Sequence, residues 1–282
     1  MSTSIPTWFI TMFDTDVKHA YQRGGSNLRG FTRQKSGVQG DQVRFNKYGT
    51  GSLGVKDRHG LVPVMNADHT VVNVTLIDRY GGEYINDLDE LKTNLDERQA
   101  AAIALAMAAG RQHDDFITDA ALLSLPSGQT TVHGSGGLTK AKVQTTFKNF
   151  NDGNIPNDGQ RVWLIAPSQW NNLLDISEFA NQDFIGPDSL PWVTGVTAKR
   201  WLGFFFMLYT NLPTGGSNSS RQTIAWHTPS MGSAASVDMR TNFDWVAERG
   251  EYFSQIRLSA NAIRIDDNGV FEVECTEENH GS

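Results

Sequence analysis

The pattern of hydrophobic and polar positions changes near residue 80. Residues 1 to about 78 are basic, rich in glycine and extended, and their aromatic residues are isolated. From Asn86 to about Leu123, apolar residues recur at helical spacing, which predicts one helix several times longer than the average of ~11–12 residues. Its N-cap is expected at Asn86 or Asp87, and Gly110 could bend it. A first quarter with little to bury, followed by such a helix, indicates a subunit that its neighbours complete.

Extended segments are predicted before this helix. Residues 42–48 place Val43 and Phe45 on one face, and residues 61–64 form a second strand that Pro63 confines to an edge. The glycine-rich linker between them predicts a long protruding hairpin. Residues 71–77 alternate as a half-buried strand, and Gly81-Gly82 is expected to open the long helix.

The rest of the chain alternates between short strands and helices. Asn268-Gly269 lies between two alternating runs, which is a strong signal for a hairpin. The predicted elements are a loop at 125–138, a helix at 139–149, a strand at 161–166 running into a helix at Pro167, strands at 202–210 and 223–227, and long strands from Tyr252 to Cys275. The predicted class is therefore α+β.

Composition bounds the protein further. With 282 residues, 39% of them hydrophobic, the chain can form one elaborated domain or two closely packed ones. The single Cys275 excludes a disulfide framework within the chain and a cysteine-based zinc site. The longest apolar run, about residues 202–209, is far short of the ~20 residues that cross a bilayer, so no membrane partner is expected.

Charge is unevenly distributed along the chain. The net charge is −7, but residues 1–60 hold nine Lys or Arg against four Asp, giving +5, and residues 238–282 hold four Arg against ten Asp or Glu, giving −6. An excess of +5 over 60 residues is weak for nucleic-acid binding. Complementary contact between subunits explains it equally well.

No motif in the sequence supports catalysis, a cofactor or a metal. Residues 49–54 match G-x-G-x-x-G, but no helix follows to present N–H groups to a pyrophosphate, so a loop tip is expected. Residues 133–137 lack the strand and helix of a nucleophile elbow. Asp14 and Asp16 lie in the arm, Asp114-Asp115 is expected to be a solvated helix face, and the seven histidines are scattered.

Four collinear stretches resemble one protein family. They are residues 14–29, residues 81–98 at the start of the long helix, residues 162–174 where a strand runs into a helix, and residues 210–213. Together they resemble the major capsid proteins of tailed bacteriophages, which have the HK97-type fold. The resemblance covers most of the chain and depends on the collinear set.

This resemblance implies a domain plan and a function. The N-terminal arm would be residues 1–30, the extended loop 31–70, the peripheral domain 71–160 with 246–282, and the axial domain 161–245. The protein would assemble into the icosahedral head of the virion, as hexamers and pentamers, in the host bacterial cytoplasm. It would enclose double-stranded DNA without sequence-specific binding.

Other expectations concern partners and processing. A separate scaffolding protein, a portal protein and a decoration or cement protein are the implied partners, and no large N-terminal processing is expected. Covalent cross-linking through Lys47 or Lys56 is not predicted, because no partner or catalytic acid is evident. The candidate contacts between subunits are Trp8, Phe9, Phe13, Arg23, Arg29, Arg33, Lys35, Arg44, Phe45, Lys47, Lys56 and Arg58.

Two other functions remain open from the sequence. One is the shell of a bacterial nanocompartment with the same fold, which is disfavoured because residues 1–30 have no amphipathic helical period for binding cargo. The other is a soluble α/β enzyme with residues 31–70 as a lid, which would require a convergent polar site.

Overall fold

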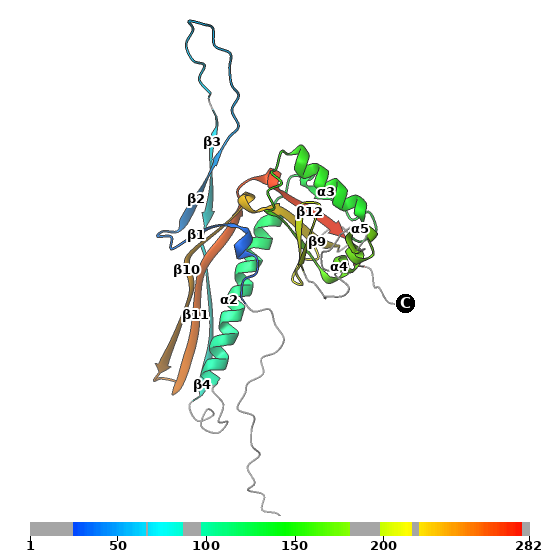
Figure 1. Ribbon diagram of the computed structural model, residues 1–282. Coiled ribbons are helices and arrows are strands. Elements are labelled where there is room, and N and C mark those ends of the chain that lie inside the picture. The colour runs from blue at the N-terminus through cyan, green and yellow to red at the C-terminus, as the bar shows by residue number, and fades with distance from the viewer. Residues whose placement is uncertain (1–24, 66, 87–96, 181–197, 216–219, 278–282) are drawn as a thin grey trace, which may run out of the picture.

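The computed structural model is elongated, and the residues that it describes form three sheets and one long helix, along with shorter helices (Figure 1). It describes residues 25–65, 67–86, 97–180, 198–215 and 220–277. A two-stranded hairpin projects from one end, a long sheet runs below it with helix α2 along one face, and a compact α/β unit lies to the side.

The elements follow one another in a mixed order of strands and helices. They are η1 (Arg29–Phe31), β1 (Arg33–Ser36), β2 (Gln42–Tyr48), β3 (His69–Thr75), β4 (Ile77–Asn86), α2 (Glu97–Leu122), η2 (Ser127–Gln129), β5 (Thr130–Thr131), α3 (Lys140–Asp152), β6 (Arg161–Ile165), α4 (Pro167–Leu174), α5 (Ser177–Ala180), β7 (Ala198–Trp201), β8 (Phe204–Leu208), β9 (Arg221–His227), η4 (Thr228–Ser230), β10 (Met231–Val246), β11 (Glu251–Arg264), η5 (Asp267–Gly269) and β12 (Val270–Cys275).

The long sheet has the strand order β1-β10-β11-β4. Only β1 runs parallel to its neighbour, and β10, β11 and β4 are antiparallel. Along β11, buried and half-buried residues alternate strictly from Phe253 to Ala262, because one face of the strand packs against α2. The opposite face is covered at one end by the base of the hairpin, where Phe45 and Val74 pack with Ala234. Beyond the hairpin no described element covers it, and we call this part the bare face.

The six-stranded sheet has the order β5-β12-β9-β6-β8-β7. Strand β6 is buried throughout, as its continuous apolar sequence predicts. Pro167 is in the first turn of α4, and the Thr139 side chain caps α3, so the helix starts expected at both places are confirmed. Two clusters of buried apolar residues lie on the two faces of this sheet.

The protruding hairpin is confirmed, but its second strand was predicted in the wrong place. Strand β2 pairs with β3 (His69–Thr75), and residues 61–64 form no strand. Val43 and Val74 are opposite each other and buried, whereas Leu61 is 95% exposed. The prediction failed because the apolar residues at 61–64 were interpreted as the face of a strand, whereas no described residue covers them.

Of the two residues predicted to cap the long helix, Asn86 is wrong. Asn86 is the last residue of β4, and Gly81-Gly82 lie within that strand. A Cβ on Gly82 would lie 2.3 Å from the Phe253 ring, so glycine is required here for close strand packing rather than for a turn. The described helix begins at Glu97 and runs through Gly110 without interruption, and Asp87 lies outside the described residues.

The predicted hairpin at Asn268-Gly269 is not formed. Strands β11 and β12 belong to different sheets, and the short turn η5 carries the chain from one sheet to the other. The sixteen-residue strand β10 was not predicted at all. The long sheet thus takes residues 231–245 from the segment expected to be axial, and the six-stranded sheet takes residues 270–275 from the one expected to be peripheral.

Candidate assembly surfaces

The far end of the hairpin is an exposed apolar loop, which we call the hairpin tip (residues 49–65). Leu53, Val55 and Leu61 are 94%, 98% and 95% exposed, and Val62 and Val64 are also exposed. Lys56 precedes the turn of residues 57–60, Arg58 lies in it, and both side chains are exposed as well. A run of apolar side chains this open, on a structure with no interior of its own, is typical of a surface that another molecule covers.

The base of the hairpin, in contrast, is packed within the subunit. Phe45 is fully buried in a cluster with Val43, Val74, Ala234 and Ile265. Its side chain is therefore unavailable to a neighbouring subunit, which corrects the expectation for this residue. The sequence placed Phe45 on an apolar strand face, but it could not show that β10 covers that face.

Polar contacts hold the same base. Lys35 places its ammonium group 5.0 Å from the centre of the Phe45 ring and donates to the Arg44 carbonyl at 2.5 Å. Lys47 pairs with Asp266 at 2.8 Å, so this cation contacts the acidic C-terminal region of its own subunit. Because both side chains are about one-third exposed, the pair contributes about 1 kcal/mol or less.

The described part of the arm is anchored to helix α2. Asp114 is fully buried and accepts hydrogen bonds from Ser26 Oγ at 2.6 Å and from the backbone N–H groups of Asn27 and Leu28 at 3.1 Å each. The expectation that Asp114 lies on a solvated helix face is therefore wrong. The carboxylate points at the arm, whose N–H groups replace the water it would otherwise bind.

The anchoring extends along the chain to β1. A Cβ on Gly110 would lie 2.4 Å from the Gly25 carbonyl carbon, so the backbones of arm and helix touch. Leu28 is fully buried in the main core, and the Trp226 indole donates to the Phe31 carbonyl at 2.8 Å. The first quarter was expected to lack an interior of its own, and this is wrong for residues 25–36.

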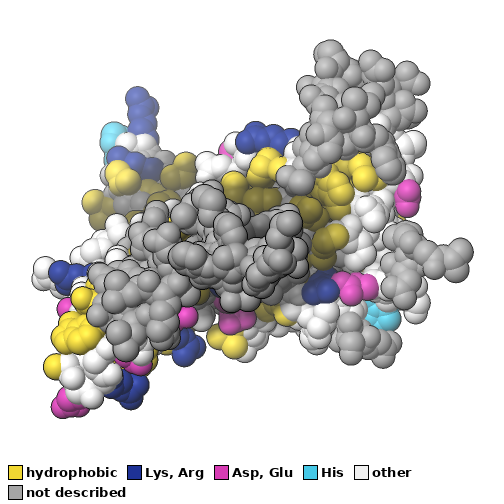
Figure 2. Space-filling model, turned by 90° about the horizontal axis from the view of Figure 1, so that it is seen from below, with side chains coloured by type: hydrophobic (Ala, Val, Ile, Leu, Met, Phe, Trp, Pro, Cys, Tyr) yellow, Lys and Arg dark blue, Asp and Glu magenta, His cyan; other side chains and the backbone are white. Residues whose placement is uncertain are grey.

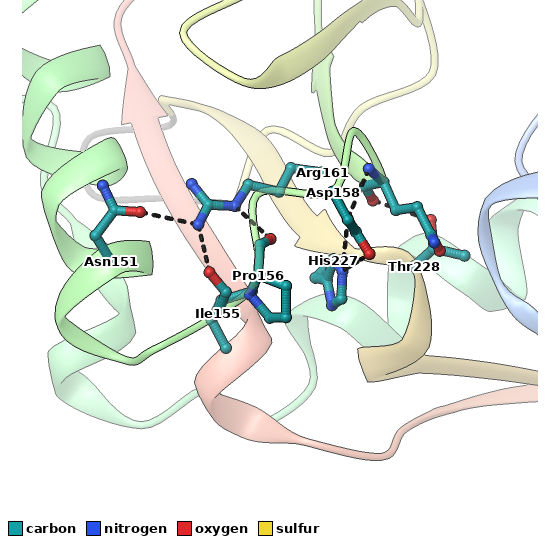
Figure 3. A network of polar contacts seen from close by, with 8 residues as sticks. Asn151, Ile155, Pro156, Asp158, Arg161, His227 and Thr228 are labelled. Atoms are coloured by element: carbon teal, nitrogen blue, oxygen red, sulfur yellow. Dashed lines mark hydrogen bonds and ion pairs between the residues drawn. The ribbon is translucent and has the colours of Figure 1, made fainter.

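A network of polar contacts stiffens the α/β unit (Figure 3). The fully buried Arg161 donates to the Pro156 carbonyl at 3.0 Å, to Asn151 Oδ1 at 2.9 Å and to the Ile155 carbonyl at 2.5 Å. Burial lowers the pKa of its guanidinium, although the nearby charge of Asp158 opposes that change. These contacts fix the turn between α3 and β6, and nothing in them suggests a reacting group.

A carboxylate–imidazole pair lies beside this network (Figure 3). His227 Nε2 lies 3.2 Å from Asp158 Oδ1, which is within hydrogen-bond distance. Burial alone would raise the pKa of Asp158, but hydrogen bonds from the Gln160 backbone N–H and from His227 outweigh it and hold this pKa below its usual value. Asp158 also accepts from Gln160 at 3.0 Å, so the pair closes a turn.

The long sheet offers two further surfaces. At the end away from the hairpin, Phe243 and Trp245 are exposed and pack on Tyr252, with ring centres 5.1 and 4.7 Å apart. Seen from below, this end carries several groups of hydrophobic side chains among charges of both signs (Figure 2). The edge of β4, and that of β10 beyond the short β1, have no hydrogen-bonded neighbour among the described residues. Such edges can accept a strand of another chain.

A family model described as phage capsid protein matches residues 5–277. The chain belongs to this family. Solved structures agree in fold. The capsid of cyanophage P-SCSP1u has 15% sequence identity and a TM-score of 0.73, and the match covers 96% of this chain and 94% of the cyanophage chain. The capsid of cyanophage Pam1 has 14% identity and a TM-score of 0.72, and covers 99% of both chains. No curated protein sequence matches.

This phage capsid protein is a structural subunit that assembles with copies of itself into the shell of a phage head, and its role is not enzymatic. The resemblance and the α+β class with the HK97-type fold are confirmed. The finding favours the phage head over the nanocompartment and the enzyme with a lid. Among the described residues, no group of His, Cys, Asp or Glu could hold a metal ion. No described helix is long and apolar enough to span a membrane.

The candidate contact residues of this capsid protein fall into three groups. Trp8, Phe9, Phe13 and Arg23 lie outside the described residues. Lys56 and Arg58 are exposed at the hairpin tip, and Arg33 and Arg44 are exposed near its base. Arg29, Lys35 and Lys47 are half-buried, and Phe45 is buried.

Sequence reasoning missed the exposed aromatic residues Tyr80, Tyr84, Phe243 and Trp245 of the long sheet. The signal that could have found them is the spacing of Phe243 and Trp245, which are two residues apart and so share one face of a strand.

Proposed function

We propose that this capsid protein forms hexamers and pentamers in which the hairpin of each copy lies across the neighbouring copy. The observation that carries the proposal is the exposure of the hairpin tip. Leu53, Val55 and Leu61 are almost fully exposed on a loop that projects well beyond the body of the subunit. Covering these side chains would remove apolar surface from water at about 25 cal/mol per Å².

The proposed domain plan follows the sheets. Residues 1–30 are the arm, and the hairpin with its flanks (31–70) is the extended loop. The long sheet with α2, including β10, serves as the peripheral domain, and the six-stranded sheet, including β12, as the axial domain. The plan is supported by the strand order of the two sheets and by the buried cluster around Trp163 and Phe206, which only the six-stranded sheet and its own helices and loops line.

Further parts of the proposal depend on the resemblance to tailed-phage capsid proteins. A separate scaffolding protein and a portal protein assist assembly in the host bacterial cytoplasm, and a decoration or cement protein binds the finished shell. The net charge of −7 supports a container that encloses DNA without binding it tightly, since a strongly basic lining would hinder release.

The hairpin can be tested by shortening it. The variant replaces residues 50–67 with a short Gly-Ser turn, which keeps the ladder from Gln42–Tyr48 to His69–Thr75 intact. We expect the isolated subunit to fold with unchanged thermal stability but to form no closed shells in negative-stain micrographs. A full-length variant with Lys56 and Arg58 replaced by serine tests separately whether the charges at the tip contribute to assembly.

The possible micrographs separate the interpretations. Shells with pentameric and hexameric units from the wild type, and only free subunits from the shortened variant, support the proposal. Normal shells from the shortened variant would refute the role of the hairpin. Discrete low-order oligomers from the wild type would refute the shell itself.

A further inference from the structure

An apolar groove lies between helix α2 and strand β10, and we call it the arm groove. Its volume is about 430 Å³, and its apolar lining is Ile103, Ala106, Met107 and Ala109 of α2 with Met239 of β10. Ile103 is 36% exposed and Met239 is 53% exposed, so the groove is open along one side. Covering these side chains is favourable, because it removes apolar surface from water.

The described part of the arm reaches one end of this groove. Gly25 and Ser26 line it. The backbone of Gly25 rests against α2 at a glycine, since a Cβ on Gly110 would lie 2.4 Å from the Gly25 carbonyl carbon. Ser26 is held at the same place by its hydrogen bond to the buried Asp114. The point at which residue 24 joins the described chain is therefore fixed at the end of the groove.

The groove continues from this point in the direction that the arm already follows. The N–H of Leu28 is held by Asp114. Three residues earlier in the arm, Gly25 rests against Gly110, which is one turn nearer the start of α2. Ile103 lies seven residues further in that direction, or about 10 Å along the helix axis. The arm groove therefore leads from Gly25 toward the start of the helix.

One aromatic residue of the arm is spaced to reach this groove. Counting back from Gly25, the first large apolar residue is Tyr21. Four residues span about 6 Å in a helix and about 13 Å in an extended chain, so Tyr21 comes within reach of the groove in either conformation. Arg29 also lines the groove, and a guanidinium group stacks favourably on an aromatic face. A tyrosine ring suits such a site, because it combines a large apolar area with a polar tip that can stay in water.

The short tether favours the ring of the same chain over a group from a neighbouring copy. A side chain four residues from an anchored point is present at an effective concentration on the order of millimolar. A group from a separate copy has no such advantage while subunits are dilute. The arm groove is also complete within one copy, since the arm, α2 and β10 all belong to the same chain.

We infer that the arm groove is the docking site for residues 17–24 of the same chain, with the ring of Tyr21 lying on Met107 and Met239. The inference goes beyond the proposed function and does not depend on it. The arm then belongs to its own subunit back to about residue 17. Only the residues before that point, which include Trp8 and Phe13, are left to contact neighbouring copies.

Photo-cross-linking in the isolated, full-length subunit tests the contact. Tyr21 is replaced by p-benzoylphenylalanine, an aromatic residue that reacts with nearby C–H bonds on illumination, and the products are mapped by peptide mass spectrometry. We expect cross-links within one chain to Met107, Met239 or Ile103. The matched control carries the same residue in place of Phe13. Twelve residues before Gly25, this position would lie about 18 Å away even in a helix, so it should label the groove at least about tenfold less.

A second measurement uses natural side chains. In Tyr21→Ser, hydrogen exchange of the amides of residues 25–28 should rise about tenfold, since loss of a partly buried ring loosens the segment that it holds. Tyr21→Phe keeps the apolar ring and should exchange within about twofold of the wild type. Equal exchange in Tyr21→Ser and the wild type would overturn the inference.

The cross-linking outcomes also separate the possible occupants. A mixture of isotopically labelled and unlabelled subunits shows whether a cross-link joins one chain or two. Cross-links to the groove that join two chains would overturn the inference in favour of a second copy. Absence of cross-links to the groove, or equal labelling from position 13, would overturn it as well. Because these experiments use isolated subunits, their failure leaves the proposed shell in place, and a failure to form shells leaves their result unchanged.

Discussion

Removing the Asp114 carboxylate should release the arm from helix α2. In the folded subunit this carboxylate accepts from Ser26 Oγ and from the backbone N–H groups of Asn27 and Leu28. The substitution Asp114→Ala takes away these three acceptor contacts and leaves the helix itself intact, because alanine is the best helix former.

The magnitude follows from the burial of the donors. A hydrogen bond to a charged group contributes about 1.5–3 kcal/mol, but the three bonds share one carboxylate and are not additive. After the substitution, water can reach the partly exposed Ser26 and Asn27, whereas the Leu28 N–H is buried and stays without a partner. We expect a loss of about 3 kcal/mol in the free energy of opening the arm, or roughly a 100-fold change in its equilibrium.

Hydrogen exchange measures this opening directly. Protection of the amides in residues 25–32 should fall by roughly 100-fold in Asp114→Ala, whereas amides in the middle of α2 should keep theirs. Asp114→Asn retains one acceptor oxygen and should lose about half of the free energy.

Asp119→Asn is the matched control, since it changes an exposed carboxylate on the same helix and should alter stability by about 0.5 kcal/mol or less. Unchanged protection of residues 25–32 in Asp114→Ala would refute the anchoring role. An equal loss of protection throughout α2 would show that the carboxylate stabilises the helix instead of the arm.

Three other results should follow. By chemical denaturation of the isolated subunit, Phe45→Ala should cost about 3–5 kcal/mol because its ring is fully buried, and Leu61→Ser should change stability by less than about 0.5 kcal/mol because its side chain is exposed. Burial raises the pKa of Cys275 from its ordinary 9.0 to about 11, so at pH 8 a thiol reagent should label it only as fast as the subunit unfolds, and stability should fall as the pH rises from 9 toward 11. The pKa of Asp158 is lowered from its ordinary 3.8, so the stability that this carboxylate contributes is present above pH 3.8 and should be lost as the pH falls through the lowered pKa. Asp158→Asn should abolish this acid dependence. The loss should be under about 1 kcal/mol, because the carboxylate is more than one-third exposed.

Sequence patterns predicted the elements whose signals are local. The helix at Pro167 and the one capped by Thr139 begin where those residues place them, since a proline in the first turn and a threonine cap act within a few residues. The buried strand β6 was found because its run of apolar residues is short and continuous.

The errors occurred where a distant residue decides the structure. Gly81-Gly82 was expected to open the long helix, but both lie within β4, where Gly82 makes room for the ring of Phe253, about 170 positions along the chain. Strand β10 escaped detection because its pairing with β11 shifts between Ala235 and Val237 and again before Arg240. Each shift breaks the period of two that identifies a strand.

The candidate contacts show the same limit. Exposure of Lys56 and Arg58 was predictable, because the glycine-rich loop around them has nothing to bury. Burial of Phe45 and Asp114 was not, since one is covered by β10 and the other by the arm. A charge or an aromatic ring in an extended segment therefore indicates a contact, and only the fold decides whether it lies within the subunit or between subunits.

The base of the hairpin is packed within the subunit, whereas its tip is left exposed for contact with a neighbour. At the base, a Cβ on Gly232 would lie 2.9 Å from the Phe45 ring and 3.0 Å from Ile265, so the hairpin, the long sheet and the turn to β12 meet without free space. Interiors packed at this density resist deformation. The base can therefore fix the direction of the projecting tip, whose own residues bury almost nothing. A tip aimed in this way needs less ordering when a neighbour covers it, because the entropy of orienting the hairpin has already been lost in folding the subunit.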